Sequence, residues 1–150
     1  MKTLLLAHDF DATSEHALDV AIELARKLAA KVVVAHVYSV PVYSFPEGSS
    51  LIPSAEDAAR IAEAAQRSLD EVLARRQPSA GVELSGELRA GVPDEELCRL
   101  AEEIGADLLV IGTHGRGAVA RALLGSVAQR VVRSAKMPVM TVRLPPPPEA

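Results

Sequence analysis

Short apolar runs alternate along this 150-residue chain with longer segments whose apolar residues recur at helical spacing. A run of four to eight apolar residues is typical of a buried strand, and apolar residues at every third or fourth position indicate an amphipathic helix. The five strands predicted in this way cover residues 3–8, 31–37, 82–88, 107–111 and 138–144. The predicted helices cover residues 13–29, 54–76, 93–105 and 126–134.

This βαβαβαβαβ order predicts an α/β fold, in which a single domain contains a five-stranded parallel sheet with helices on both faces. Ligands of such sheets bind beyond the carboxyl ends of the strands, where the strand order reverses. The residues that follow Ala7, Val37 and Ile111 are therefore candidates for a ligand site. The domain is expected to span residues 1–144, and the proline-rich residues 145–150 are predicted to form a disordered tail.

Residues 38–53 interrupt the alternation with prolines, serines and a glycine, so a long loop is predicted there. A loop of this length inside a compact domain is usually functional or mobile. Two interpretations stay open at this point. The loop closes over a bound ligand, or it is a variable surface excursion.

The composition disfavours several classes of function. The chain has 16 basic and 20 acidic residues, a net charge of −4, and only 3% aromatic residues, so neither electrostatic binding to nucleic acid nor base stacking is expected. A single cysteine, Cys98, rules out an internal disulfide and favours a reducing, cytoplasmic location. No apolar run approaches the ~20 residues that span a bilayer, so no membrane association is expected. His8 and Asp9 end the first apolar run too early for a signal peptide.

The glycines after the fourth predicted strand suggest an anion site. Gly112 and Gly115 are separated by two residues, and nine further residues precede Gly125 and Ser126. A glycine turn exposes backbone N–H groups, and the N-terminus of the following helix favours phosphate. Ser126 with Gln129 three residues later also matches a capping box. Neither the Walker motif nor the Gly-x-Gly-x-x-Gly dinucleotide motif fits these positions.

The pattern Gly-x2-Gly-x9-Gly-Ser, late in a five-stranded α/β chain, strongly resembles the universal stress protein family, and specifically its ATP-binding subgroup. The resemblance extends over nearly the whole chain and includes residues 7–15, 35–37, 91–93 and 136–142. One departure is Ala7, where many members have proline.

The resemblance implies a Rossmann-like fold of the adenine-nucleotide alpha-hydrolase type that binds ATP as a regulatory or stress-response module. By the same resemblance, Asp9 lies beside the ribose, the phosphates or a Mg²⁺ ion, and Val37 offers backbone groups to adenine. The nucleotide-binding residues proposed on this basis are Ala7, His8, Asp9, Val37, Gly112, Thr113, His114, Gly115, Arg116, Gly125, Ser126 and Val127.

The resemblance further implies a homodimer through the last strand. The interface residues would be Val139, Met140, Thr141 and Val142. An apolar edge strand left unpaired would be a liability, which independently favours pairing with a second copy.

Two other functions stay open. The chain could be a dimeric interaction module without a nucleotide, whose glycines serve only helix–strand packing, or it could be a weak ATPase. A dedicated enzyme is disfavoured because the sequence shows no evident general base, paired carboxylates or P-loop lysine, so no catalytic residue is assigned and at most slow hydrolysis is expected. No His, Asp and Glu cluster has metal-ligand spacing, which leaves Asp9 as the metal candidate through a magnesium nucleotide. The sequence does not identify a protein partner.

Overall fold

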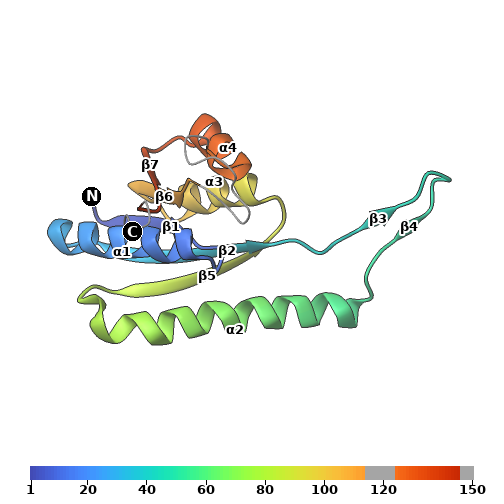
Figure 1. Ribbon diagram of the computed structural model, residues 1–150, viewed down its shortest axis with the longest axis horizontal. Helices are drawn as coiled ribbons and strands as arrows, with labels where there is room; N and C mark the ends of the chain where they lie inside the picture. Colours follow the sequence, from blue (N-terminus) through green and yellow to red (C-terminus); the bar gives the residue numbers. More distant parts are fainter. Residues whose placement is uncertain (114–123, 146–150) are drawn as a thin grey trace, which may run out of the picture.

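Five parallel strands form the central sheet in the order β5-β2-β1-β6-β7 (Figure 1). The computed structural model describes residues 1–113 and 124–145. The strands of the sheet are β1 (Thr3–Ala7), β2 (Lys31–Tyr38), β5 (Leu84–Ala90), β6 (Leu108–Gly112) and β7 (Val139–Val142). The helices are α1 (Ala12–Leu28), α2 (Ala55–Ala80), α3 (Pro93–Glu103) and α4 (Ser126–Ser134).

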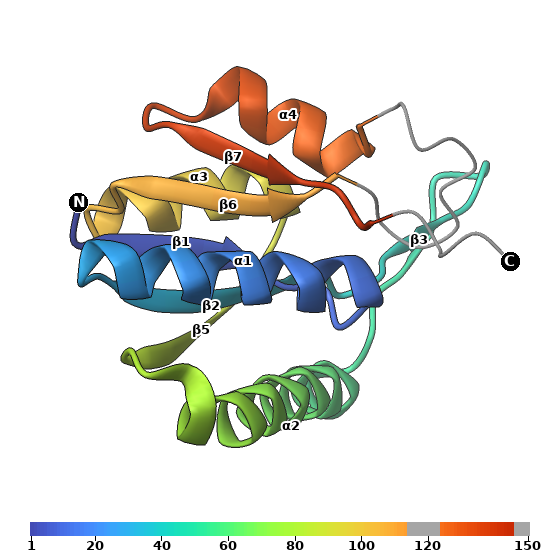
Figure 2. The same cartoon turned by 60° about the vertical axis from the view of Figure 1, so that its left-hand side comes forward.

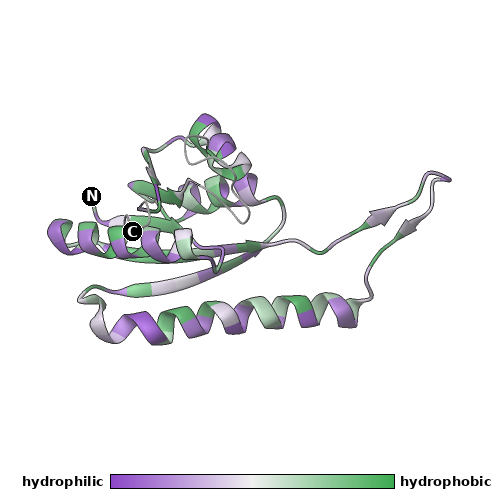
Figure 3. Ribbon diagram, in the orientation of Figure 1, coloured by the Kyte–Doolittle hydropathy of each residue, from purple (hydrophilic) through white to green (hydrophobic). Residues whose placement is uncertain are grey.

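Helices cover both faces of this sheet (Figure 2). Successive strand residues point to opposite faces. Leu4 and Leu6 of β1 therefore pack in the cluster that includes α1 and α2, whereas Leu5 packs with α3 and α4. Because both faces are covered, the central strands are mainly apolar, as Figure 3 shows. The predicted α/β fold class is confirmed.

The strand order reverses beside β1. The chain moves from β1 outward to β2 and β5 on one side, and then returns to β6 and β7 on the other side. The carboxyl ends of β1 and β6 therefore meet at the switch point where ligands of such sheets bind.

The second helix is longer than its sequence pattern predicts. It continues past residue 76 to Ala80 although Pro78 lies in its last turn. The Arg26 guanidinium, from α1, donates hydrogen bonds to the carbonyl oxygens of Ser79 (2.8 Å) and Ala80 (2.6 Å). These bonds satisfy carbonyl groups that a helix end leaves unpaired, so a distant residue extends the helix.

Residues 38–53 contain a hairpin that the sequence pattern missed. Strands β3 (Tyr43–Ser44) and β4 (Ser50–Leu51) pair antiparallel and project away from the sheet beyond the carboxyl end of β2 (Figure 1). The hairpin therefore does not close over the switch point in this structure.

Two expectations concern the chain as a whole. Of the expected disordered tail, residues 145–150, only residue 145 belongs to the described residues. Within the described residues, no helix is long and apolar enough to cross a membrane.

Candidate functional site

A cavity of about 180 Å³ opens at the carboxyl ends of β1, β2 and β6. Nine of the residues proposed for nucleotide binding line this cavity together. They are Ala7, His8, Asp9, Val37, Gly112, Thr113, Gly125, Ser126 and Val127. His114, Gly115 and Arg116 lie outside the described residues.

A tight turn between β1 and α1 shapes one rim of the cavity. The Asp9 N–H donates to Ser14 Oγ (2.9 Å), and the Ser14 N–H donates to Asp11 Oδ1 (2.8 Å), so Asp11 caps α1. Phe10 lies between them with a φ of 60°, a left-handed conformation that is strained for a bulky residue. The carboxylate of Asp11 is therefore engaged in capping the helix, whereas Asp9 is exposed at the rim of the cavity.

His8 is a buried residue of the cavity lining, with one ring nitrogen hydrogen-bonded and the other facing a carboxylate. Its Nδ1 accepts a hydrogen bond from the Phe10 N–H (3.0 Å), which places the proton of the neutral ring on Nε2. That Nε2 lies 3.5 Å from Glu15 Oε1. Burial lowers the pKa of His8 below 6.5, and the carboxylates of Glu15 and Asp11 offset only part of this effect.

Glu15 joins the cavity floor to α2. Its carboxylate accepts hydrogen bonds from Arg75 (2.5 Å) and Arg76 (2.7 Å), and Arg76 also binds Asp19. Burial favours the neutral form of Glu15. The hydrogen bonds from Arg75 and Arg76 and the neighbouring His8 outweigh burial, so the pKa of Glu15 lies below 4.5.

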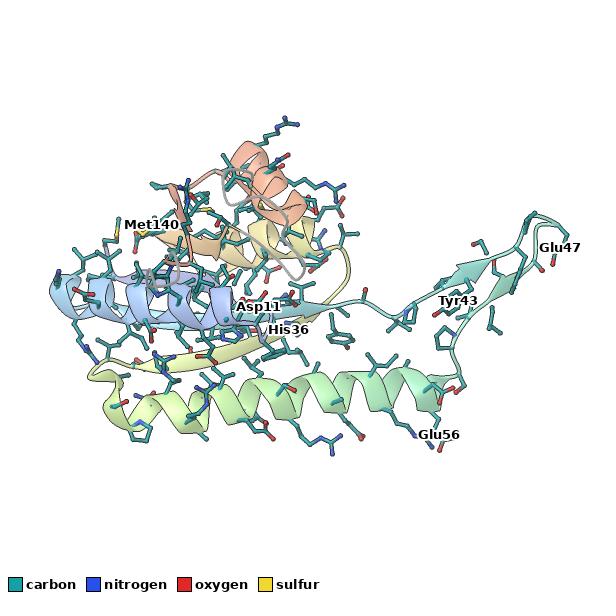
Figure 4. The ribbon with its side chains drawn as sticks, in the orientation of Figure 1. Asp11, His36, Tyr43, Glu47, Glu56 and Met140 are labelled. Atoms are coloured by element: carbon teal, nitrogen blue, oxygen red, sulfur yellow. The ribbon has the colours of Figure 1, made fainter. Side chains whose placement is uncertain are left out.

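His36 forms the opposite part of the floor. Its Nδ1 lies 2.8 Å from the carbonyl oxygen of His8, and its ring packs 4.4 Å from the ring of Phe10. His36 and Asp11 both lie at the carboxyl end of the sheet, well away from the projecting Tyr43 and Glu47 (Figure 4). Both histidines therefore support the turn that carries Asp9.

The N-terminus of α4 opens into the cavity. The capping box predicted for Ser126 and Gln129 is wrong. Gly125 is the N-cap residue, no side chain of the described residues caps the helix, and the Gln129 amide donates to the Leu124 carbonyl instead (3.1 Å). The first N–H groups of a helix have no partner within the helix. Val127 also lines the cavity. These N–H donors and the positive end of the helix dipole give the described part of the cavity wall a positive electrostatic potential at α4.

Gly112 has a packing role beside its place in the cavity wall. A Cβ atom at this position would lie 2.6 Å from Thr13 Cγ2, far closer than real carbon contacts. The end of β6 can therefore approach α1 only because residue 112 lacks a side chain.

The remaining walls are largely apolar. Ala35, Pro93, Leu97 and Ile111 line the cavity, and α3 supplies two of them. Sequence reasoning missed the α3 residues, since Leu97 looks like any core leucine and only the packing of α3 on the sheet brings it here. Asp9 and Asp11 are the carboxylates of the described lining, which contains no Lys or Arg.

The predicted dimer strand is an edge of the sheet, but its side chains are not equally available. Val142 is only 6% exposed and packs in the core. Thr141 is exposed, and Val139 and Met140 are partly buried. A second copy would therefore meet the backbone edge and Thr141 rather than the side chain of Val142.

Comparison with known proteins adds to this geometry. The sequence model of the universal stress protein family matches residues 1–143. The universal stress protein MJ0531 of Methanocaldococcus jannaschii is 35% identical over 146 residues, which cover 96% of this chain and 83% of that protein. A solved universal stress protein in complex with cAMP is 29% identical, with a TM-score of 0.71 over 95% of this chain and 97% of that chain. A solved universal stress protein from Archaeoglobus fulgidus in complex with dAMP is 25% identical, with a TM-score of 0.62 over 95% of this chain and 98% of that chain.

Proposed function

This chain belongs to the universal stress protein family, and on that premise we propose that it binds an adenine nucleotide, ATP foremost, as a regulatory module of the cytoplasmic stress response. One observation carries the proposal. The N-terminus of α4, which no side chain of residues 1–113 or 124–145 caps, opens into the cavity at the switch point of the sheet. Free N–H groups at a helix N-terminus, together with its dipole, favour phosphate. The cAMP and dAMP complexes of similar proteins support adenine as the base.

The apolar walls suit the base of such a ligand. Ala35 and Val37 from β2, with Leu97 from α3, would cover the faces of an adenine ring. Ligand pockets commonly combine apolar walls with a few placed polar groups. Here the backbone of β2 would provide the polar groups for the ring edge, so the base lies toward β2 and the phosphates toward α4.

Asp9 is the residue that would hold the ribose hydroxyls or a magnesium ion. Its carboxylate is exposed at the rim, and no hydrogen bond or ion pair engages it among the described residues. Mg²⁺ in nucleotide sites is usually held by one or two carboxylates together with phosphate oxygens. The described residues contain no cluster of three potential ligands that would bind a metal without the nucleotide. When bound, Mg²⁺ would neutralise phosphate charge beside Asp9.

Hydrolysis by this site would be slow. His8 is the nearest candidate for a general base, but its Nδ1 accepts from Phe10 and its Nε2 faces Glu15. Neither nitrogen is offered to a water molecule in the cavity. The residues bind and orient the nucleotide, and the described part of the site assigns no group to activate water.

The proposal includes a homodimer through β7, which is an edge strand of the sheet among the described residues and offers backbone groups of the kind that a second copy can bond. This dimer is equally compatible with the second candidate, an interaction module without a nucleotide. The packing role of Gly112 favours that candidate in one respect, because it explains one glycine without a ligand. Nucleotide binding therefore decides between the two.

The deciding experiment is calorimetric titration of the protein with ATP, with and without Mg²⁺, and with AMP. Mass spectrometry of nucleotides released on denaturation complements it. We expect micromolar binding of Mg-ATP. If Asp9 holds the metal, Asp9→Asn should weaken the binding of Mg-ATP alone. If Asp9 holds the ribose, the substitution should weaken the binding of ATP and AMP equally. Asp70→Asn on α2 is the matched control. If denaturation releases no nucleotide and none of these ligands gives a heat of binding, the interaction module without a nucleotide would be the function that remains.

A further inference from the structure

The hairpin between β2 and α2 has an unusual surface. We call residues 39–54 the arm. They contain a single charged residue, Glu47, although charged residues make up 24% of the chain. Five large apolar side chains of the arm are exposed by 46–69%. They are Val42, Tyr43, Phe45, Leu51 and Ile52. The three prolines of the arm, Pro41, Pro46 and Pro53, limit pairing through its backbone but leave these apolar side chains exposed, and an exposed apolar patch of this kind indicates an interaction surface.

The arm cannot be stable as an isolated element. Its strands are two residues each, and β3 pairs only with β4. A two-stranded hairpin is marginal in water without further packing. Residues 41–52 are all exposed, so the arm does not obtain that packing from its own domain.

The helix that follows the arm has a partly exposed apolar stripe of its own. We call residues 55–68 the overhang, because no residue of α2 before Leu69 is buried. At 26 residues α2 is about 39 Å long, whereas the seven residues of β5 span about 23 Å. The overhang carries one half-covered face of small and apolar residues at helical spacing. These residues are Ala58, Ile61, Ala62 and Ala65.

The arm and the overhang lie at the same end of the molecule, with the arm reaching outward beside the N-terminus of α2 (Figures 1 and 4). The 14 residues of the overhang are about 21 Å long, and each leg of the arm has a similar length of about 25 Å. We propose that the arm of one copy packs on the overhang of a second copy, and that a two-fold axis repeats the contact in the other direction.

A second copy is favoured as the occupant because each chain carries both halves of the contact. The arm has one charged residue, and the half-covered face of the overhang has none, although five charged residues occupy other positions of the overhang. The area is also sufficient. Five half-exposed apolar side chains offer on the order of 500 Å² per arm, so two arms and the surfaces that they cover bury about 2,000 Å² in total. Stable protein interfaces bury 1,200–2,000 Å². This contact lies on α2 and is separate from the edge of β7, and it does not depend on nucleotide binding.

The first test measures self-association by sedimentation in a Thr141→Pro background, which removes an outward N–H from the β7 edge. We expect this protein still to dimerise. Leu51→Ser with Ile52→Ser should raise the dimer dissociation constant at least a hundredfold, because four apolar side chains per dimer lose their contact. Leu28→Ser with Val132→Ser, at exposed apolar positions outside the arm, is the control. A monomeric background protein, or equal dissociation constants for both pairs, would overturn the proposal.

The second test locates the contact. One preparation carries Ile52→Cys, and a second, distinguished by an affinity tag, carries Ala62→Cys. Oxidation of the mixture should give a disulfide-linked pair of two different chains, whereas Val132→Cys in place of Ala62→Cys should not. Native Cys98 is buried, so it contributes only a background level of disulfide formation. A chain with both substitutions that forms only an internal disulfide would show the arm folded onto its own helix, which would contradict the proposal.

Discussion

Gly112→Ala tests whether a glycine of the motif serves packing, nucleotide binding or both. The new Cβ would lie 2.6 Å from Thr13 Cγ2, so either the buried Thr13 side chain must leave its present rotamer or the end of β6 and the start of α1 must separate by almost 1 Å. Overpacking of this kind typically costs about 1–3 kcal/mol. For a 150-residue chain, that loss corresponds to a fall in Tm of roughly 2–12 °C.

Thr13→Ser should rescue the variant. The other neighbours of the new Cβ are Thr13 Cβ and the Thr13 carbonyl oxygen, both at 3.5 Å, which are ordinary contacts. Loss of the Thr13 methyl group alone costs about 0.8 kcal/mol. The double variant should therefore be about as stable as Thr13→Ser, with a coupling energy of about 1–3 kcal/mol in urea unfolding, equal to the cost of Gly112→Ala alone.

Nucleotide affinity of the same four proteins completes the test. Because the Cβ points toward α1, the double variant should bind ATP as Thr13→Ser does. If the double variant is stable but does not bind, residue 112 must approach the nucleotide directly. If it remains as unstable as Gly112→Ala, the clash with Thr13 is not the cause, and the packing argument is refuted.

Three further predictions concern the floor of the site and the sheet edge. The pKa of His8 in the folded chain lies below 6.5, so the unfolded chain binds the proton at a higher pH than the folded chain does. The free energy of unfolding should therefore fall as the pH drops below about 6.5. His8→Asn, which can still accept a hydrogen bond from the Phe10 N–H, should lose this part of the pH dependence in urea unfolding. Glu15→Gln should cost about 1–2 kcal/mol because Arg75 and Arg76 lose a shared carboxylate, whereas Glu23→Gln, in an exposed pair, should change stability by less than about 0.5 kcal/mol. In a protein that carries Leu51→Ser and Ile52→Ser, the further substitution Thr141→Pro should remove association through β7, whereas Thr141→Ser should not. If Thr141→Pro leaves the sedimentation profile of that protein unchanged, the dimer does not form through β7.

The order of strands and helices could be predicted from the sequence because each element has its own local apolar pattern. The ends of elements depend on distant residues. Arg26 extends α2 by bonding its last carbonyl groups, and Asp107 accepts hydrogen bonds from the N–H groups of Lys2 and Thr3 at the start of β1. No window of neighbouring residues contains such information. The hairpin was missed because its two short strands carry no alternation long enough to recognise.

The site was predictable where it depends on topology. Residues that follow β1 and β6 had to meet, because the ends of neighbouring parallel strands lie at one edge of the sheet. The contact of His8 with Glu15, and of Glu15 with Arg76, requires α1 to pack beside α2, which no local pattern indicates. The capping box failed for a different reason. Gly125 takes the N-cap position, which moves Ser126 into the first turn.

Two of the helix N-termini at the cavity, those of α1 and α4, differ in a way that sets the direction in which a nucleotide can bind. At α1, the carboxylate of Asp11 accepts from the Ser14 N–H and adds negative charge, so phosphate is disfavoured there. At α4, Gly125 is the N-cap residue, and no side chain among the described residues caps the first N–H groups. Gly125→Asp should therefore stabilise α4 by a few tenths of a kcal/mol and reduce ATP affinity at least tenfold, with little effect on adenosine. Gly125→Asn, a neutral cap, should reduce ATP affinity less. Equal losses for ATP and adenosine would place the phosphates away from α4 and reverse the proposed orientation.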